Sequence, residues 1–424
     1  MKRLFKNAVI NGQRLNLLTE GAYIAYIGEE IPPADELIDL EGKIILPGMI
    51  DPHVHVRDLG QSEKEDWHTA SQAALKGGVT TLFDMPNTIP PTTNRNALNL
   101  KREAARKSAV RYKFNFGVTE HNLREIKEIL NERFADIAAL KMFLAGSSAN
   151  EYVEDIDTIR RVFDLSYQFD IPVIIHTEIQ KCIEKYASLR PHPGILDHGF
   201  IRHRECTNRG TELVIKLAKE IGNPVYIAHT STAEEVQMIR ENKNKARIYC
   251  EVTPHHLLLN EHILHTAGNY AKVNPPLRTE ADNRALWEAV SDGTVDAVGT
   301  DHAPHTLAEK NKPYPRAPSG FPGLETGLPL LLNEVKKGKL SLARLVELYS
   351  TRAAEIFGLN DRGNIRTGKK ADLVIVDMNK TARVEARNFV SKAKYSPYEG
   401  MEIIPVEMTV MDGMIKYLRN QTEQ

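Results

Sequence analysis

Short runs of apolar, β-branched residues recur along most of this chain, and stretches with helical periodicity separate them. The eight runs between residues 44 and 300 are 44–55, 80–85, 112–118, 137–144, 173–177, 225–230, 247–253 and 297–300. Strands that alternate with helices pair in parallel through right-handed crossovers. Eight such units over about 250 residues match a closed (β/α)8 arrangement. The fold class that we predict is therefore α/β, with a (β/α)8 TIM barrel.

Both ends of the chain have β character outside this repeat. Residues 4–45 alternate apolar runs with turn signals such as Asn11-Gly12, and β patterns return at 371–377 and 407–411. We expect residues 1–45 and 371–424 to form a small β-sandwich domain, beside a catalytic barrel of residues 46–370. The Pro- and Lys-rich stretch 310–318 has no periodicity, and it is expected to be a long surface loop and a candidate lid.

Composition excludes several classes of function. The net charge is −1 and the charges of both signs are interspersed, so neither a nucleic-acid groove nor a polybasic membrane patch is indicated. The amino terminus lacks the apolar run of a secretory signal, and no stretch is long enough to span a membrane. We therefore expect a cytoplasmic protein that acts on a small molecule, without nucleic-acid or membrane partners.

The three cysteines, Cys182, Cys206 and Cys250, form no CxxC pair and are far apart in the sequence. This spacing argues against a disulfide framework and against a thiolate zinc site. We expect all three to be reduced thiols.

Residues that can bind a metal lie at the carboxyl ends of four predicted strands. His53 and His55 alternate along the first strand and so face the same side of it, although such a pair alone often occurs by chance. His176, His229 and Asp301 end strands five, six and eight, at the rim where barrel active sites lie. Nitrogen and oxygen ligands without thiolates are typical of a catalytic zinc site, and five of them are enough for two ions.

Lys141, at the end of the fourth predicted strand, does not fit beside two cations as an ammonium ion. Carboxylation by carbon dioxide would convert it into an anion whose two oxygens can bridge two metals. The alternative is a lysine whose amine reaches solvent from the strand end. His255 and His256, after Thr253-Pro254, are more typical of residues that support a site than of direct ligands.

These motifs together resemble the amidohydrolase superfamily. The resemblance rests on Leu46–His55, on the histidines after strands five and six, on Gly299–His305, and on Gly368-Lys369-Lys370-Ala371-Asp372-Leu373. The resemblance is to the cyclic-amide branch of this superfamily, and it implies two Zn²⁺ ions per subunit. An N6-carboxylysine, here at Lys141, would bridge them. His53, His55 and Asp301 would bind the first ion, and His176 and His229 the second. Asp301 would also be the catalytic proton shuttle.

The substrate ring is indicated by residues that could bind a carboxylate. Arg57, two residues beyond His55, is expected to face the same pocket by strand alternation and to bind a carboxylate through two parallel hydrogen bonds. Asn87 and His305 could add donors. Alternatively, Arg57 pairs with Asp58 or Glu65, and Asn87 only forms a turn.

In these residues the chain resembles dihydroorotases, which cyclise N-carbamoyl-L-aspartate to (S)-dihydroorotate for pyrimidine biosynthesis. That resemblance implies that Arg57, Asn87 and His305 hold the substrate carboxylate. It also implies substrate contacts from His55, Asn274, Ser319 and Gly320, although many relatives have an aromatic residue in place of Ser319. Some bacterial dihydroorotases have an aspartate instead of the bridging lysine, so Lys141 departs from that subgroup.

Other members of this branch remain alternatives. Residues 84–93 and 396–400 also resemble allantoinases, from which Arg57 distinguishes the chain, and dihydropyrimidinases or hydantoinases share the metal motif. A non-enzymatic alternative is an inactive scaffold, which would typically have lost metal ligands that this chain retains. The resemblance further implies a homo-oligomer, and it leaves association with an aspartate transcarbamoylase open.

Overall fold

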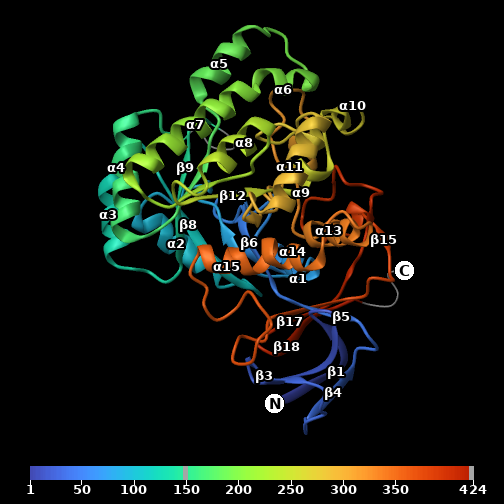
Figure 1. Ribbon diagram of the computed structural model, residues 1–424. Coiled ribbons are helices and arrows are strands. Elements are labelled where there is room, and N and C mark those ends of the chain that lie inside the picture. The colour runs from blue at the N-terminus through green and yellow to red at the C-terminus, as the bar shows by residue number, and fades with distance from the viewer. Residues whose placement is uncertain (147–150, 420–424) are drawn as a thin grey trace.

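The computed structural model describes residues 1–146 and 151–419, and its centre is a barrel of parallel strands (Figure 1). The strands are β6 (Met49–Val54), β7 (Val79–Asp84), β8 (Arg111–Gly117), β9 (Ile137–Phe143), β10 (Val173–His176), β11 (Val225–Ile227), β12 (Ile248–Val252) and β13 (Ala297–Val298). They pair in sequence order from β6 to β13. A parallel bridge between Val54 and His302 joins the two ends of the sheet, so the prediction of a (β/α)8 barrel is confirmed.

Helices surround the barrel and connect its strands. Those between successive strands are α1 (Trp67–Lys76), α2 (Arg95–Ala105), α3 (Leu123–Asn131), α4 (Ile156–Phe169), α5 (Gln180–Ser188), α6 (His198–Ile201), α7 (Arg204–Ile221), α8 (Ala233–Asn242), α9 (Pro254–Leu258), α10 (Leu264–Ala267) and α11 (Glu280–Asp292). After β13 follow α12 (Leu307–Lys310), α13 (Gly327–Lys336), α14 (Leu342–Val346) and α15 (Arg352–Ile356). Helix α1 shows the pattern: a capping box at Asp66 begins it, and Trp67, Ala70 and Ala74 are buried in the core.

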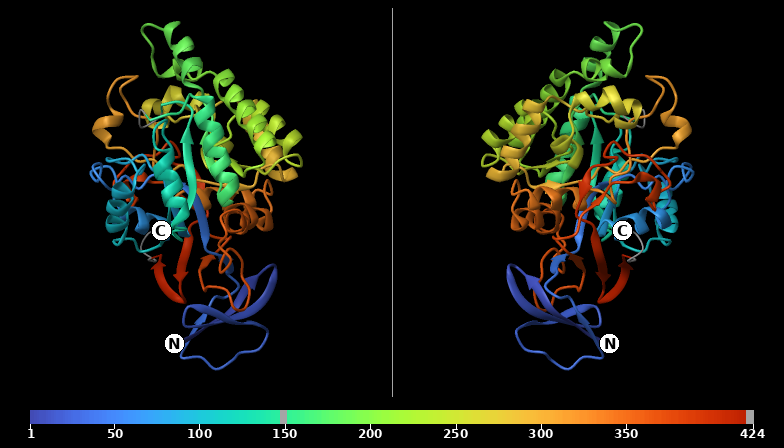
Figure 2. Two further views of the ribbon diagram at one scale, coloured as in Figure 1. Left: turned by 90° about the vertical axis from the view of Figure 1, so that its left-hand side faces the viewer. Right: turned by 90° about the vertical axis from the view of Figure 1, so that its right-hand side faces the viewer.

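The two ends of the chain share one eight-stranded sheet at the end of the molecule opposite α5 (Figures 1 and 2). Its strands are β1 (Lys2–Ile10), β2 (Gln13–Glu20), β3 (Tyr23–Gly28), β4 (Glu36–Asp39), β5 (Ile44–Pro47), β14 (Leu373–Val376), β17 (Val406–Met411) and β18 (Met414–Leu418). We call it the terminal sheet. Residues 420–424 of the predicted carboxyl-terminal unit lie outside the described residues.

The single strand predicted over 44–55 is wrong, because two strands in different sheets occupy it. Strand β5 pairs with β14 and β1 of the terminal sheet, whereas β6 begins the barrel. Gly48 lies between them and donates its N–H to Asp372 O at 2.8 Å. A Cβ atom there would lie 2.2 Å from Thr80 Oγ1, so a larger residue at this change of sheet would collide with the buried Thr80 side chain.

Part of the carboxyl-terminal segment leaves the terminal sheet and packs beside the barrel mouth. Strands β15 (Ala382–Arg383) and β16 (Glu402–Ile403) form a two-stranded sheet of their own. Between them Phe389, Tyr395 and Tyr398 join a buried cluster with Leu259 and Val273 from the loops after β12.

The prediction of three reduced cysteines is wrong for two of them. Cys182 of α5 and Cys206 of α7 form a disulfide with a Cα–Cα distance of 5.3 Å, whereas Cys250 is a buried free thiol. The pair is 24 residues apart in sequence, and only the packing of α5 against α7 brings the two together. Within the described part of the chain, no helix has the length and apolar character needed to cross a membrane.

Candidate metal centre

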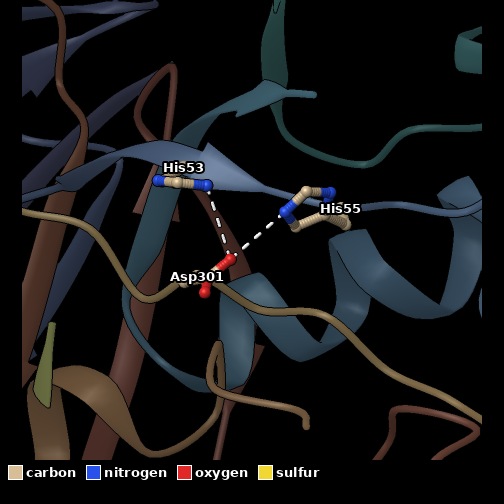
Figure 3. A group of neighbouring side chains, drawn as sticks. All are labelled: His53, His55 and Asp301. Atoms are coloured by element: carbon tan, nitrogen blue, oxygen red, sulfur yellow. Dashed lines mark hydrogen bonds and ion pairs between the residues drawn. The ribbon is translucent and has the colours of Figure 1, made fainter. Parts of the chain in front are cut away.

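His53, His55 and Asp301 converge at the carboxyl end of the barrel (Figure 3). Both histidines come from the end of β6. Asp301 follows β13, the strand that neighbours β6 where the barrel closes. The Nε2 atoms of His53 and His55 lie 3.4 Å and 3.1 Å from Asp301 Oδ1. All three potential ligand atoms lie within 4.8 Å of one another and the residues are buried, which suits a single divalent ion.

His176 and His229 form a second pair next to the first group. His176 Nδ1 lies 3.0 Å from His229 Nε2. The ring centroids of His53 and His229 are 5.2 Å apart, so the two groups share one cavity. His176 donates its Nε2–H to Glu178 at 2.8 Å, so Nδ1 keeps a lone pair, and this lone pair faces His229. His176 and His229 therefore present two nitrogen ligands for a second ion.

Lys141 reaches this region from β9 and is fully buried. Its Nζ has no hydrogen-bond partner among the residues that the structure describes. Burial lowers the pKa of Lys141 to about 8, partly offset by the charges of Glu251 and Asp301. An isolated buried amine is costly, and its neutral form is the one that reacts with carbon dioxide. The environment of Lys141 thus fits the predicted carboxylation.

The electrostatics also favour metal binding. Burial lowers the pKa of His55 to about 3, so this ring is neutral at physiological pH. Burial alone would raise the pKa of Asp301, but His53 and His55 hold it below its usual range. Neutral imidazoles and an ionised carboxylate are the forms that bind divalent metals.

Two buried glutamates at this centre were not identified from the sequence. Glu251 of β12 contacts His53 Nδ1, and Glu178 contacts His176. A charged residue within the apolar strand Ile248–Val252 is a signal that could have found Glu251. Glu178 could have been identified from its position, because it lies two residues beyond His176, a proposed ligand.

Arg57, Asn87 and His305 lie beside the first group of ligands. Arg57 Nη2 is 3.2 Å from His305 Nε2, and Asn87 Oδ1 is 2.6 Å from His55 Nδ1. We predicted that Arg57 faces the same pocket as His55 because side chains alternate along a strand. That reason is wrong: β6 ends at Val54, and Arg57 has φ +67°, so it does not lie in a strand. Its guanidinium is buried and contacts neither Asp58 nor Glu65 within the described chain.

A cavity lies over both groups of ligands and includes the other predicted substrate contacts. Its lining residues are His53, His55, Phe143, His176, His229, Val273, Asn274, Asp301, Ala303, Ser319 and Gly320. Ser319 Oγ donates to Asn274 Oδ1 at 3.1 Å, and His305 Nε2 lies 3.0 Å from Ser319 O.

Two buried lysines hold the loop that carries Ser319 and Gly320. Lys272 donates to Pro315 O at 2.9 Å, and Lys310 donates to Pro318 O and Gly320 O at 3.0 Å and 2.9 Å. These contacts anchor the stretch 310–318, predicted as a candidate lid, next to the cavity wall that Ser319 and Gly320 form.

The barrel and its clustered side chains define a TIM-barrel protein with a candidate metal centre at the barrel mouth. The model of the amidohydrolase family matches residues 44–415, and the chain belongs to this family, as its motifs predicted. A dihydroorotase of Methanosarcina mazei is 36% identical over 419 residues, which cover 96% of this chain and 91% of the relative. A dihydroorotase of Carboxydothermus hydrogenoformans is 33% identical, with 96% and 94% covered.

Solved structures agree with the fold. L-hydantoinase from Arthrobacter aurescens superposes with a TM-score of 0.94 at 28% identity, covering 99% of this chain and 96% of that one. Dihydropyrimidinase from Brevibacillus agri gives a TM-score of 0.92 at 26% identity, with 99% and 96% covered.

Proposed function

We propose that this protein is a dihydroorotase, which catalyses the reversible cyclisation of N-carbamoyl-L-aspartate to (S)-dihydroorotate. The observation that carries this assignment is the burial of Arg57 without an anionic partner. This residue is 1% exposed, and among the described residues no carboxylate forms an ion pair with its side chain. A buried guanidinium without an anion is costly, and the carboxylate of this substrate would supply the missing partner. The dihydroorotases similar to this chain support the same choice.

The centre would hold two zinc ions. We assign His53, His55 and Asp301 to one ion, His176 and His229 to the other, and carboxylated Lys141 to the bridge between them. The convergence of these side chains and the lack of a hydrogen-bond partner for Lys141 Nζ support this assignment. When bound, the ions would activate water and polarise the carbonyl group of the ring amide.

The remaining steps belong to the protein. Asp301 would take a proton from the attacking water at its carboxylate and deliver it to the ring nitrogen as that nitrogen leaves. Arg57, Asn87 and His305 would hold the substrate carboxylate, and Asn87 would also orient His55 through Nδ1. Asn274, Ser319 and Gly320 would contact the ring from the cavity wall. In the direction of cyclisation the same groups act in reverse order.

We further propose that the enzyme is cytoplasmic and homo-oligomeric. We propose two units, a barrel of residues 48–370 and a terminal unit of 1–47 and 371–424; the boundary moves from the predicted residue 46 because β5 (Ile44–Pro47) pairs in the terminal sheet. Hydantoinase or dihydropyrimidinase activity is the second candidate, because the solved structures named above bear those names. The buried Arg57 favours an anionic substrate over these neutral rings.

The test is turnover of carbamoyl-aspartate, dihydroorotate, dihydrouracil, hydantoin and allantoin by the purified protein, with zinc content measured on the same sample. Turnover of only the first two, with two ions per chain, is the expected result. Turnover of a neutral ring instead would overturn the substrate assignment. An inactive protein without metal would support the scaffold alternative.

A further inference from the structure

The carboxylate of Glu251 lies behind both groups of candidate metal ligands. Its Oε1 is in close contact with His53 Nδ1 and also accepts the backbone N–H of His229 at 3.1 Å. Its Oε2 accepts the hydroxyl of Tyr226 at 2.9 Å. The side chain is fully buried on β12, between these partners. One carboxylate therefore contacts one residue from each half of the centre.

The contact with His53 determines which ring nitrogen faces the cavity. When Nδ1–H donates to Glu251, Nε2 keeps its lone pair, and this atom is the one directed toward Asp301. Without the carboxylate, the ring could take the other tautomer or rotate.

The contact with His229 holds a backbone conformation that this residue rarely adopts. His229 has φ +36°, in the left-handed region that is unfavourable for a residue with a side chain. Its backbone N–H donates to Glu251 Oε1, which is buried. The position of the His229 ring thus depends on the same carboxylate as the His53 ring.

The surrounding residues leave room for Glu251 and for little else. A Cβ atom on Gly299 of the next strand segment would lie 2.5 Å from Glu251 Oε2 and 2.9 Å from His53 Cβ. By contrast, among the described residues Glu178 contacts a ligand histidine of one half only, and it also pairs with Arg202.

We infer that Glu251 is a positioning residue that couples the two metal subsites, because it orients His53 of one and His229 of the other. This inference rests on the proposed function, since it requires that both subsites bind metal. Loss of Glu251 then lowers the affinity for both ions, whereas loss of Glu178 lowers only the affinity for the ion at His176 and His229.

The test compares zinc content of the full-length protein at a chelator-buffered free zinc concentration that just fills the wild-type centre. Loss of a carboxylate behind a ligand histidine typically weakens metal binding about 10- to 100-fold. We expect two ions in the wild type, one in Glu178→Gln and fewer than one in Glu251→Gln. Glu235→Gln is the matched control and should keep two, because Glu235 is equally buried but caps α8 through Ser231 and Thr232.

The outcomes separate the inference from the function on which it rests. Two ions in Glu251→Gln, or a loss of only one, would overturn the coupling, whereas a wild type that binds no zinc would overturn the proposed metal centre itself. Thermal unfolding of the metal-free variants shows whether each still folds. If Glu251→Gln does not fold, Tyr226→Phe removes one contact of the same carboxylate, and a smaller weakening of both ions is then expected.

Discussion

Arg57 is the residue on which the choice of substrate depends. The Arg57→Met change should raise KM for carbamoyl-aspartate about 10- to 100-fold, because hydrogen bonds to a charged group are lost from the bound and the transition state alike. Steady-state kinetics of the pure variant would measure this. Arg316→Met, on an exposed part of the loop after β13, is the control. An unchanged KM in Arg57→Met would remove the argument for an anionic substrate.

Asp301 combines two roles at one carboxylate. In Asp301→Asn we expect kcat to fall roughly 10²- to 10⁴-fold, since the amide cannot move a proton. Substrate affinity, measured by equilibrium binding, should change little. Zinc content must be determined on the same sample, because Asp301 is also a proposed ligand. A variant that loses only substrate binding would contradict the role in proton transfer.

At the scale of elements, α7 approaches the end of β10 at Gly210. Replacing a glycine inside a helix by alanine normally stabilises a protein by up to about 1 kcal/mol. Here the added Cβ would lie 1.7 Å from Thr177 O, so Gly210→Ala should instead destabilise the protein by about 1–3 kcal/mol. Because Thr177 lies between His176 and Glu178, kcat should fall as well.

Denaturant unfolding and steady-state kinetics check both effects. Gly199→Ala in α6 is the control, since its Cβ would meet no atom of the described chain within 4 Å. Equal stability of the two variants would show that α7 can move away from Thr177 at little cost.

The loop that forms the cavity wall is expected to respond to pH through Lys272. Burial, followed by the charge of Arg202, lowers the pKa of Lys272 from 10.5 to about 8. Between these values the unfolded chain binds the proton more readily than the folded one, so the free energy of unfolding should rise with pH across this interval.

Lys272→Met lacks this contribution. The difference in unfolding free energy between the wild type and Lys272→Met should therefore increase from pH 8 to pH 10.5, as measured by urea denaturation at several pH values. A constant difference would mean that Lys272 has an ordinary pKa in the folded protein.

At the scale of the whole molecule, the carboxyl-terminal segment braces the site. Tyr395 Oη accepts the N–H of His305 at 3.2 Å and donates to Gly320 O at 3.3 Å. Tyr395→Phe should raise KM about fivefold, which corresponds to the roughly 1 kcal/mol of an ordinary hydrogen bond. Tyr186→Phe, which removes a hydroxyl bonded to Glu205, is the control. An unaltered KM in Tyr395→Phe would show that the segment only covers the barrel.

The sequence alone was enough for the barrel and for the convergence of His53, His55, His176, His229 and Asp301. Hydrophobic periodicity is local, and the carboxyl ends of parallel strands in a barrel must meet at one rim. Any residue that ends such a strand can therefore be placed before the tertiary contacts are known.

Only the tertiary structure decided which groups support that site. Glu251 contacts His53 from 198 positions away in the sequence, and Cys182 meets Cys206 through the packing of two helices. The strand change at Gly48, the backbone of Arg57 and the path of Tyr395 likewise depend on distant segments. A local pattern can mark a residue such as Glu251 as unusual, but it cannot identify its partner, because these contacts arise only after the barrel has closed and brought the segments together.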